Sequence, residues 1–520
     1  MEVTLHLTQT LHKTVRENPS ALATVFGQRR HSYAQLQQRV AQLAGAFQQL
    51  GVQASDRIGM LSLNSDYYVE YIYATFWAGA VINPVNTRWS VPEIAYSLID
   101  CDTKILLVDD NFVKFIDELR YLCPCLEKII YCGSGPAPAH TLEYEQLITT
   151  TAPIVDTLRS HQDLAAILYT GGTTGKPKGV MLSHASLMTN ALATIAATSR
   201  PPVQAGLHIA PFFHVGGIAY LIQVSLRAAT HVILSGFDPV KAMQTIEKER
   251  ISETFLVPTM LQMILDSSEF TKYDLSSLSN LIYGAAPIDE TLLHRALDCL
   301  PNTQFMQVYG MTENAAVVAV LPAFCHTHEG QKLRKLKSVG RPTPITEVGI
   351  IHPETGEACK AGQFGEITIR SPTLMEGYWN KLEETSHALR DGWLYTGDGG
   401  YLDEDGYLYI TDRLKDMIVS GGENVYSSEV ENAILTHPAV QLCAVIGIPH
   451  EKWGEAVHAV VVVHEGHVLT EDEVKAVCRN LIASYKCPRS VEFRTELPLS
   501  GAGKLLKYKL REALQQKNTA

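Results

Sequence analysis

Cysteine is scarce in this chain of 520 residues, which contains only ten. Their spacing gives no Cys-x-x-Cys pair, and Cys123-Pro-Cys125 comes nearest to one. A fold held by disulfides is therefore not expected, and we interpret the thiols as those of a reduced, cytoplasmic protein. Segment 325–328, Cys-His-Thr-His, has metal-ligand residue types but no second ligand group, so a surface loop is the preferred interpretation.

Positive charge and long apolar runs are also in short supply. Lys and Arg number 43 against 55 Asp and Glu, a net charge of −12, which lacks the basic face of a nucleic-acid-binding protein. The longest nearly uncharged stretch, 71–85, is shorter than the ~20 residues of a membrane-spanning helix. Neither end carries a secretory, peroxisomal or prenylation signal, so a cytoplasmic protein is expected. The basic run Lys332, Arg334, Lys335 and Lys337 fits a solvated loop better than a contact with anionic lipid.

The most informative stretch is 169–180, Tyr-Thr-Gly-Gly-Thr-Thr-Gly-Lys-Pro-Lys-Gly-Val. It lies between two apolar, strand-like runs, 165–169 and 180–182. Glycines let the backbone approach an anion, and successive N–H groups in a turn form a concave anion site. The stretch therefore predicts a phosphate-binding loop. It is neither a Walker loop, because Pro177 interrupts that pattern, nor a dinucleotide-binding Gly-x-Gly-x-x-Gly loop.

Short apolar runs alternate with helical patterns through the first 400 residues. The apolar spacing in 36–50 predicts a helix that ends at Gly51, and strands are expected at 58–63, 105–108 and 129–131. Strands separated by helices imply parallel pairing, with helices on both faces of the sheet.

The pattern changes near residue 411, where a compact unit begins. Ser428 and Glu431 have the spacing of a capping box, strands are expected near 440–446 and 456–463, and helices near 473–483 and 504–514. We predict an α/β fold with a large N-terminal domain of parallel and mixed sheets flanked by helices and a small, mobile α+β C-terminal domain. The predicted bounds are 1–412 for the large domain, 413–416 for a hinge and 417–520 for the small domain.

The glycine loop resembles the signature loop of the adenylate-forming enzymes, the superfamily of acyl- and aryl-CoA synthetases, peptide-synthetase adenylation domains and firefly luciferase. The serine usual in that family is replaced here by Gly171 or Gly172. Segments 377–380 and 412–431 are most similar to those of fatty acyl-CoA ligases. The resemblance covers residues from about 30 to 510. Its other motifs follow in the family's order at 211–217, 283–287, 308–313, 393–398, 412–416 and 498–504.

The resemblance implies a nucleotide site. Within it, Tyr309 would stack on adenine, Thr312 would contact the α-phosphate region, and Asp398 and Arg413 would contact the ribose. Glu313 would hold Mg²⁺, a hard cation that prefers carboxylate oxygens. The residues implied to bind ATP are Thr170, Gly171, Gly172, Thr173, Thr174, Gly175, Lys178, Gly284, Ala285, Ala286, Tyr309, Gly310, Met311, Thr312, Asp398, Arg413 and Lys504.

The resemblance also implies catalytic, hinge and CoA-binding residues. Lys504 would bridge the acid's carboxylate and the α-phosphate, although an extra Ala-Gly precedes it where the family usually has Pro-Ser-Gly-Lys. Lys415 falls on the position about which the family's small domain rotates. The implied catalytic set is Lys504, Glu313, Thr170 and His214. The implied CoA contacts are Arg88, Ser420, Gly421, Gly422, Trp453, Lys486 and Arg489.

The expected reaction joins a carboxylic acid to CoA through an acyl adenylate, with ATP, Mg²⁺ and CoA as cofactors. A medium- or long-chain fatty acid is expected, because small residues at 216–217 would leave an aliphatic tunnel open that gains ~0.8 kcal/mol per buried CH₂. An aryl acid of the benzoate or cinnamate type is the alternative, and so is a carrier protein as the acyl acceptor. The implied substrate pocket comprises Phe213, His214, Gly216, Gly217 and Tyr283.

Overall fold

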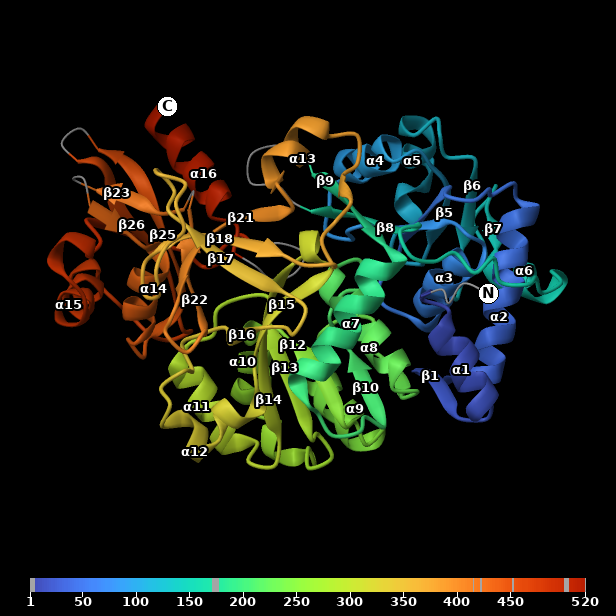
Figure 1. Cartoon of the computed structure of the whole chain (residues 1–520), viewed down its shortest axis with the longest axis horizontal. Coiled ribbons are helices and arrows are strands. Elements are labelled where there is room, and N and C mark those ends of the chain that lie inside the picture. Colours follow the sequence, from blue (N-terminus) through green and yellow to red (C-terminus); the bar gives the residue numbers. More distant parts are fainter. Residues whose placement is uncertain are drawn as a thin grey trace.

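The computed structural model describes residues 5–170, 177–414, 416–420, 423–450, 453–499 and 505–519. These residues form several β-sheets with helices packed on them (Figure 1). In that view the sheet nearest the C-terminus lies at the left, with α16 above it, and α2 and β6 lie at the right.

The sheet that ends at the predicted adenine site is mixed, with the order β16-β15-β14-β13-β12-β10-β11-β1-β2. Strands β1, β11, β10, β12, β13 and β14 run parallel, as expected from alternating strands and helices. The bounds are β1 Leu22–Phe26, β2 Arg29–Ser32, β10 Ala205–His208, β11 Thr230–Ile233, β12 Glu253–Leu256, β13 Asn280–Gly284, β14 Gln304–Met311, β15 Ala316–Leu321 and β16 Arg341–Pro342.

A second mixed sheet carries the strands on either side of the glycine loop. Its order is β19-β9-β8-β4-β3-β5-β6-β7, and only the pairs that involve β9 are antiparallel among its described strands. The bounds are β3 Arg57–Leu61, β4 Val81–Pro84, β5 Thr103–Val108, β6 Lys128–Tyr131, β7 Leu142–Glu143, β8 Leu164–Thr170, β9 Lys178–Ser183 and β19 Gly377–Tyr378.

Two smaller sheets follow in the last third of the chain. One is antiparallel and comprises β17 Glu347–Ile351, β18 Gly365–Arg370, β20 Leu389–Arg390, β21 Trp393–Leu402 and β22 Leu408–Arg413. The other belongs to the C-terminal part and comprises β23 Ile418–Ser420, β24 Glu423–Val425, β25 Val440–His450, β26 Gly454–Val463 and β27 Ser490–Phe493.

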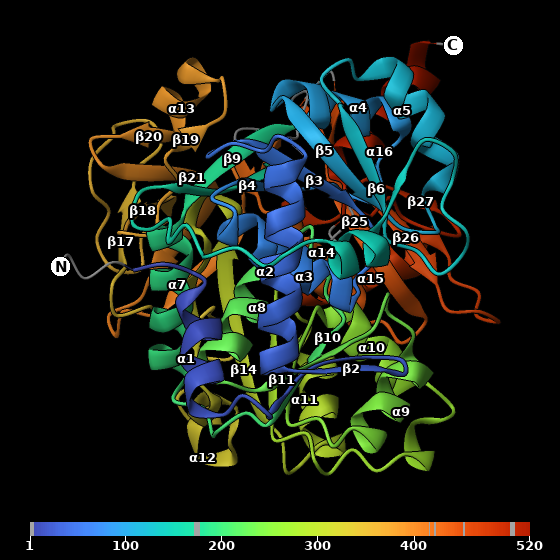
Figure 2. The same ribbon diagram turned by 90° about the vertical axis from the view of Figure 1, so that its right-hand side faces the viewer.

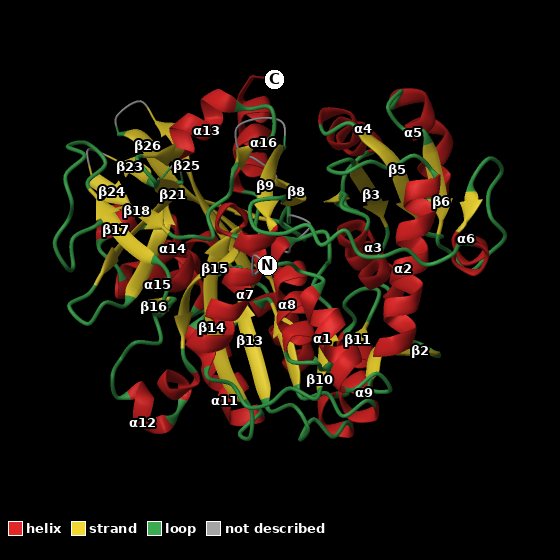
Figure 3. Ribbon diagram, turned by 45° about the vertical axis from the view of Figure 1, so that its right-hand side comes forward, coloured by secondary structure: helices red, strands yellow, loops and turns green. Residues whose placement is uncertain are grey.

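Helices cover both faces of the sheet that holds β13 and β14. Helices α7 and α8 pack on one face (Figure 3), and α9, α10 and α11 supply apolar side chains to the core on the other. Figure 2 shows α2 running lengthwise beside α3. The helices before residue 200 are α1 Gln9–Glu17, α2 Tyr33–Gln49, α3 Asp66–Trp77, α4 Val91–Asp100, α5 Ile116–Leu122, α6 Tyr144–Thr150 and α7 His184–Thr198. The later ones are α8 Val215–Leu226, α9 Pro239–Lys248, α10 Pro258–Asp266, α11 Glu290–Cys299, α12 His328–Gln331, α13 Leu382–Ala388, α14 Ser427–Leu435, α15 Glu471–Leu481 and α16 Lys507–Thr519. Short 3₁₀ turns are η1 Val113–Phe115, η2 Phe270–Lys272, η3 Thr312–Asn314, η4 Ala323–His326 and η5 Ser484–Lys486.

The α/β prediction is confirmed, with a large sheet-and-helix part followed by a smaller C-terminal part. The expected strands and helices occur close to their predicted positions, and Gly51 follows α2 with a φ of 93°. The capping box predicted at Ser428 is wrong. Helix α14 begins at Ser427, and the hydroxyl of Ser428 donates to the carbonyl of Thr411. Along the described parts of the chain, no helix combines the length and apolar character needed to cross a membrane.

Candidate active site

The base of the glycine loop is an antiparallel pair of strands, β8 and β9. Thr170 lies opposite Lys178, and Tyr169 lies opposite Gly179. The Thr170 hydroxyl donates to the Lys178 carbonyl at 3.5 Å. The predicted phosphate contacts between these strands lie outside the described residues, namely Gly171, Gly172, Thr173, Thr174 and Gly175.

Strand β19 brings Tyr378 to the predicted phosphate and metal residues. Tyr378 pairs with Val180 of β9, its hydroxyl donates to Oε1 of Glu313 at 2.9 Å, and the Lys178 ammonium lies 4.9 Å from the centre of its ring. Burial, followed by the nearby Glu313 carboxylate, raises the pKa of Tyr378, so the phenol stays protonated and remains a donor. Tyr378 was not among the predicted site residues. In the sequence, segment 377–380 was used only as a similarity to fatty acyl-CoA ligases, and no site role was predicted for it.

The predicted ribose-binding carboxylate is held from two sides. Asp398 is 5% exposed, and it lies opposite Arg413 where β21 pairs with β22. Its Oδ1 is 2.7 Å from Nε of Arg413, and its Oδ2 accepts from the Tyr309 hydroxyl at 2.6 Å. Burial acts to lower the pKa of Arg413, but the Asp398 carboxylate beside it raises that pKa overall. The structure thus brings three of the predicted nucleotide residues together.

Close backbone contacts explain two glycines at the predicted adenine site. A Cβ on Gly284 would overlap the carbonyl of Val308, and a Cβ on Gly310 would overlap the carbonyl of Ala316. Ala285 follows with a φ of +66°, a left-handed conformation that few residues adopt. The turn at 284–286 and the end of β14 therefore place bare backbone side by side, which suits a flat ligand. Met311 ends β14, and Thr312, 7% exposed, begins η3.

On the predicted acid side, His214 caps α8 by accepting a hydrogen bond from the Gly216 amide at 3.5 Å. A Cβ on Gly217 would overlap the Pro211 carbonyl, so this glycine is required by the turn. Phe213 is buried beside His214. Tyr283 is 0% exposed and donates its hydroxyl to Nε2 of His326 at 2.8 Å, which places its ring in the core that α9–α11 cover.

Two of the predicted CoA contacts lie together in the C-terminal part. Arg489 lies 4.5 Å from the centre of the Trp453 ring, whose centre is 4.3 Å from that of His450. Lys486 instead pairs with Glu429 at 2.6 Å. Among the other predicted contacts, Arg88 is exposed between β4 and α4, Ser420 ends β23, and Gly421 and Gly422 lie outside the described residues.

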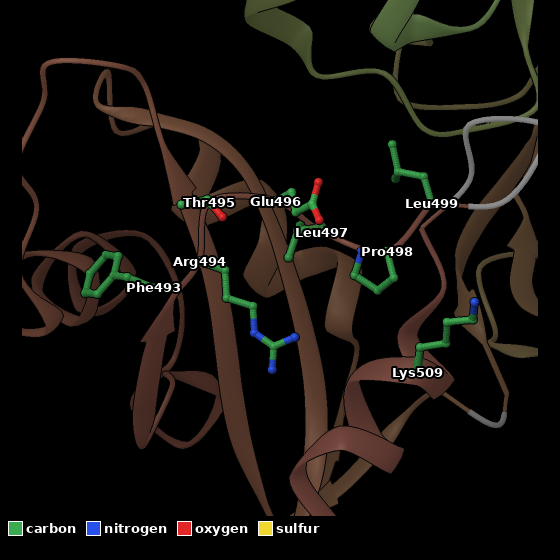
Figure 4. Close-up of a pocket in the computed structure, with 8 residues that line it drawn as sticks. All are labelled: Phe493, Arg494, Thr495, Glu496, Leu497, Pro498, Leu499 and Lys509. Carbon is green, nitrogen blue, oxygen red and sulfur yellow. The ribbon is translucent and has the colours of Figure 1, made fainter.

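The predicted catalytic Lys504 and hinge Lys415 both lie outside the described residues, but the structure describes their flanks. Leu499 and Leu505 form an antiparallel bridge that closes the base of the lysine loop. Beside it is a cavity of about 770 Å³, with Leu499 at its edge and the ammonium of Lys509 across from Arg494 (Figure 4). Around Lys415, the backbone amide of Asp416 donates a hydrogen bond to the carbonyl of Arg413 at 2.9 Å.

Two other sequence features serve the fold. The surface-loop interpretation of 325–328 is wrong for its first two residues, because Cys325 and His326 are buried in the turn η4. Among the residues that the structure describes, no group of three His, Cys, Asp or Glu side chains is placed to hold a metal ion. In the basic run, Lys335 pairs with both Asp403 and Asp405 at 2.7 Å. Those carboxylates neutralise its charge locally.

The family model of the AMP-binding enzymes matches residues 11–379, and the model of the AMP-binding enzyme C-terminal domain matches residues 429–504. The chain belongs to the AMP-binding enzyme family. A feruloyl-CoA synthase from an Amycolatopsis species is 37% identical over 500 residues, covering 96% of this chain and 97% of the relative. A long-chain-fatty-acid–CoA ligase from Bacillus subtilis is 32% identical over 527 residues, covering 95% and 92%. The crystal structure of ATP-bound MatB from Rhodopseudomonas palustris matches with a TM-score of 0.89 at 30% identity over 99% of both chains.

Membership in the AMP-binding enzyme family confirms the predicted superfamily and enzyme class, an AMP-forming acid–thiol ligase of the acyl-CoA synthetase branch. The relatives include both aryl and fatty acid ligases. The roles of individual residues and the domain bounds at 412 and 417 stay predictions.

Proposed function

We propose that this AMP-binding enzyme activates a carboxylic acid with ATP and transfers the acyl group to CoA, releasing AMP and pyrophosphate. The observation that carries the proposal is the grouping of Asp398, Tyr309 and Arg413 at 2.6–2.7 Å. A buried carboxylate held by a phenol and a guanidinium is well suited to accept hydrogen bonds from the two ribose hydroxyls.

In the first step, a carboxylate oxygen of the acid attacks the α-phosphorus of ATP. A new P–O bond forms, and the bond to pyrophosphate breaks. Negative charge gathers on phosphate and carboxylate oxygens, so stabilisation must come from preorganised donors and cations. Lys178, opposite Thr170 at the base of the glycine loop, would supply one such cation, and Lys504 would bridge the two reactants.

Mg²⁺ is expected to accompany ATP, and the carboxylate of Glu313 fits as a hard oxygen ligand. Its orientation is fixed by the hydroxyl of Tyr378 at 2.9 Å. When bound, the ion would neutralise charge on the phosphate oxygens.

In the second step, the CoA thiolate attacks the adenylate carbonyl. A C–S bond forms, and AMP departs with the electrons of the C–O bond. The Trp453–Arg489 pair offers an aromatic face and a cation for the nucleotide end of CoA.

Lys415 is proposed as the hinge residue about which the C-terminal part rotates to present this surface. Replacing it with proline should slow thioester formation much more than adenylation, whereas equal slowing of both steps would contradict the hinge role.

The test of the reaction is acid-stimulated exchange between radiolabelled pyrophosphate and ATP, followed by CoA-dependent release of AMP. Lys504→Ala should lower the exchange rate ~10²–10³-fold, because one preorganised charge contact is lost. A Lys504→Ala enzyme with half of the wild-type exchange rate would contradict the assignment. If AMP release requires a carrier protein with a free pantetheine thiol and ignores free CoA, the acceptor is the carrier's pantetheine.

The acid is proposed to be aromatic, in line with the feruloyl-CoA synthase among the relatives. The relation to a long-chain-fatty-acid–CoA ligase supports a fatty acid as the second candidate. A panel of aryl and fatty acids, scored by CoA-dependent AMP release, separates the two.

A further inference from the structure

The turn that carries the predicted metal carboxylate has an unusual backbone. Residues 312–317 include η3 and lead from the predicted adenine strand β14 into β15. Within them, Ala315 and Ala316 follow one another with φ values of +54° and +116°. Residues other than glycine rarely adopt positive φ, because the Cβ then crowds the backbone. Both alanines are buried, and we name residues 312–317 the strained turn.

The strained turn also lies tightly against β14. The carbonyl oxygen of Ala316 is 1.5 Å from the position that a Cβ on Gly310 would occupy. Gly310 lies opposite Val317 where β14 pairs with β15. The conformation of the turn therefore affects the predicted adenine strand as well as Thr312 and Glu313, which the turn carries.

A buried asparagine on a neighbouring helix holds the strained turn. Asn190 is 2% exposed on α7, which lies beside β15 (Figure 1). Its Nδ2 donates to the carbonyl of Asn314 at 2.9 Å and to that of Val317 at 2.8 Å. Its Oδ1 accepts from the Val317 amide at 3.1 Å. One side chain thus makes three hydrogen bonds to the backbone on both sides of the two alanines with positive φ.

Asparagine suits this position because its carboxamide carries both kinds of hydrogen-bonding group. The Val317 amide can only donate and the two carbonyls can only accept, so the side chain must present an oxygen to the first and N–H groups to the others. Alanine at position 190 would remove all three hydrogen bonds. A buried backbone group without a partner is costly, so we expect the turn to relax into another conformation.

The segment before β19 holds the same turn through two further hydrogen bonds. The Thr373 hydroxyl donates to Oδ1 of Asn314 at 2.9 Å, and the Met375 amide donates to the carbonyl of Glu313 at 2.8 Å. Thr373 and Asn314 are both 0% exposed. Backbone strain persists only where the surrounding structure over-determines it, and it is concentrated at functional sites.

Asn190 also connects the strained turn to the base of the glycine loop. Strand β9 begins at Lys178, and α7 begins at His184 directly after this strand. Asn190 lies about two turns into the helix, ~10 Å from its start. A strand and a helix therefore run without a break from a predicted phosphate contact to the turn that carries Glu313.

We infer that Asn190 is a positioning residue of the adenylation site, which keeps the strained turn in its unfavourable conformation and so fixes Glu313 as a ligand for the Mg²⁺ that accompanies ATP. The inference rests on the proposed function. Asn190 acts through the backbone of the turn, whereas Tyr378 orients the Glu313 carboxylate itself. Groups that orient a metal ligand commonly contribute ~10–100-fold to metal affinity or activity.

The test measures nucleotide binding in the absence of acid, so it does not depend on turnover. Isothermal titration calorimetry with α,β-methylene ATP, once with Mg²⁺ and once with EDTA, gives the gain in affinity that the metal supplies. Asn190→Ala should reduce this gain ~10-fold, because Glu313 is no longer held in place. The affinity in EDTA should change far less. Acid-stimulated pyrophosphate exchange by the same variant should need ~10-fold more Mg²⁺.

Two further variants keep the test decisive if Asn190→Ala folds poorly. Thr373→Val removes one hydroxyl of the same network at nearly constant volume, and it should reduce the gain from Mg²⁺ several-fold. Glycine adopts the φ of Ala316 without strain, so adding Ala316→Gly to Asn190→Ala should restore part of the lost gain. Such a rescue is not expected if Asn190 only supports α7.

The matched control is Thr194→Val, one turn further along α7. The buried Thr194 hydroxyl donates within the helix, to the carbonyl of Asn190 at 2.8 Å. This variant should keep the wild-type gain from Mg²⁺, and a loss equal to that in Asn190→Ala would overturn the inference.

The inference is also overturned if Asn190→Ala and Thr373→Val lower the melting temperature but keep the wild-type gain from Mg²⁺, because both side chains would then only support the fold. Equal binding of the analogue by the wild-type enzyme with Mg²⁺ and with EDTA would overturn it as well. A wild-type enzyme that neither binds the analogue nor shows acid-stimulated exchange would instead contradict the proposed function.

Discussion

Tyr309 has two separable parts at the nucleotide site. Its ring is predicted to stack on adenine, and its hydroxyl donates to Asp398 at 2.6 Å. Burial, together with the Asp398 carboxylate, raises the pKa of Tyr309 well above its ordinary value, so the proton stays on the phenol. The hydroxyl therefore orients the carboxylate that is proposed to hold the ribose.

Tyr309→Phe keeps the ring and removes this hydrogen bond. Because a hydrogen bond to a charged group contributes about 1.5–3 kcal/mol, we expect the KM for ATP to rise ~10-fold or more while the acid's KM stays unchanged. Pyrophosphate exchange at varied ATP measures the effect. Tyr395→Phe is the control on β21, since the Tyr395 ring lies against Arg390 instead. An unchanged KM for ATP would show that Arg413 alone orients Asp398.

Tyr378→Phe removes the hydroxyl that donates to Glu313. The freed carboxylate would sample more orientations, so we expect half-maximal exchange to require several-fold more Mg²⁺ and kcat to fall ~10-fold. A titration of exchange rate against Mg²⁺ measures this. Tyr401→Phe is a suitable control, because Tyr401 stacks on Tyr409 in the sheet of β21 and β22. If Tyr378→Phe lowers kcat with no change in the Mg²⁺ requirement, its hydroxyl serves another purpose.

At the scale of elements, ion pairs and hydrogen bonds connect α16 to the segments around the predicted hinge. Lys507, on its first turn, lies 2.8 Å from Glu431 of α14 and donates to the hydroxyl of Ser427, which in turn donates to Asp412. One turn later, Arg511 pairs with Asp416 at 2.7 Å. The helix that follows the lysine loop therefore contacts Asp416 of the predicted hinge directly and is connected to Asp412 through Ser427.

Lys507→Met should destabilise the C-terminal part by about 3–5 kcal/mol, because it leaves Glu431 buried without its cation. Burial acts to lower the pKa of Lys507, but the Glu431 carboxylate raises that pKa overall, so the ammonium of Lys507 stays charged. Adding Glu431→Leu should recover most of the loss. Urea unfolding followed by near-ultraviolet circular dichroism measures both effects.

The control for this pair is the exposed i,i+4 pair Lys13–Glu17 on α1, whose charged atoms are 2.7 Å apart. Lys13→Met should cost less than about 1 kcal/mol, since water solvates both charges. Equal losses from Lys507→Met and Lys13→Met would contradict the structural role of the buried pair.

Local patterns predicted most elements well, because their causes are local. The apolar spacing of α2 and the glycine after it are readable from adjacent residues, and so are the continuous apolar runs of β25 and β26. The Ser428–Glu431 spacing misled for the opposite reason. Both side chains are engaged by distant segments, with Ser428 donating to Thr411 and Glu431 pairing with Lys507.

The same distinction applies to the site. Asp398, Arg413 and Glu313 lie in contiguous motifs, so a resemblance found them. Tyr378 reaches Glu313 only because β19 pairs with β9, and the local sequence does not reveal this long-range strand pairing.

For the whole molecule, several histidines are buried between sheets and helices where an imidazolium has no room for hydration. Burial lowers the pKa of His231 to about 3 and those of His184 and His326 to about 4. Below the ordinary histidine value of 6.5, the unfolded chain therefore binds protons that the native protein does not. Stability should rise with pH across this window and be lost as the pH falls from about 6.5 towards 4.

We therefore expect the urea midpoint to fall between pH 7 and pH 5, with each such histidine contributing up to ~1.4 kcal/mol per pH unit below its unfolded value. His326→Gln should make this dependence shallower by about one proton, because glutamine accepts the Tyr283 hydroxyl hydrogen bond without titrating. His294→Gln, at an exposed position on α11, is the control and should leave the slope unchanged. Urea unfolding measured at several pH values gives the slope of stability against pH for each variant. A slope that is unaffected by His326→Gln would mean that His326 binds protons equally in the native and unfolded protein, which would contradict the expected effect of its burial.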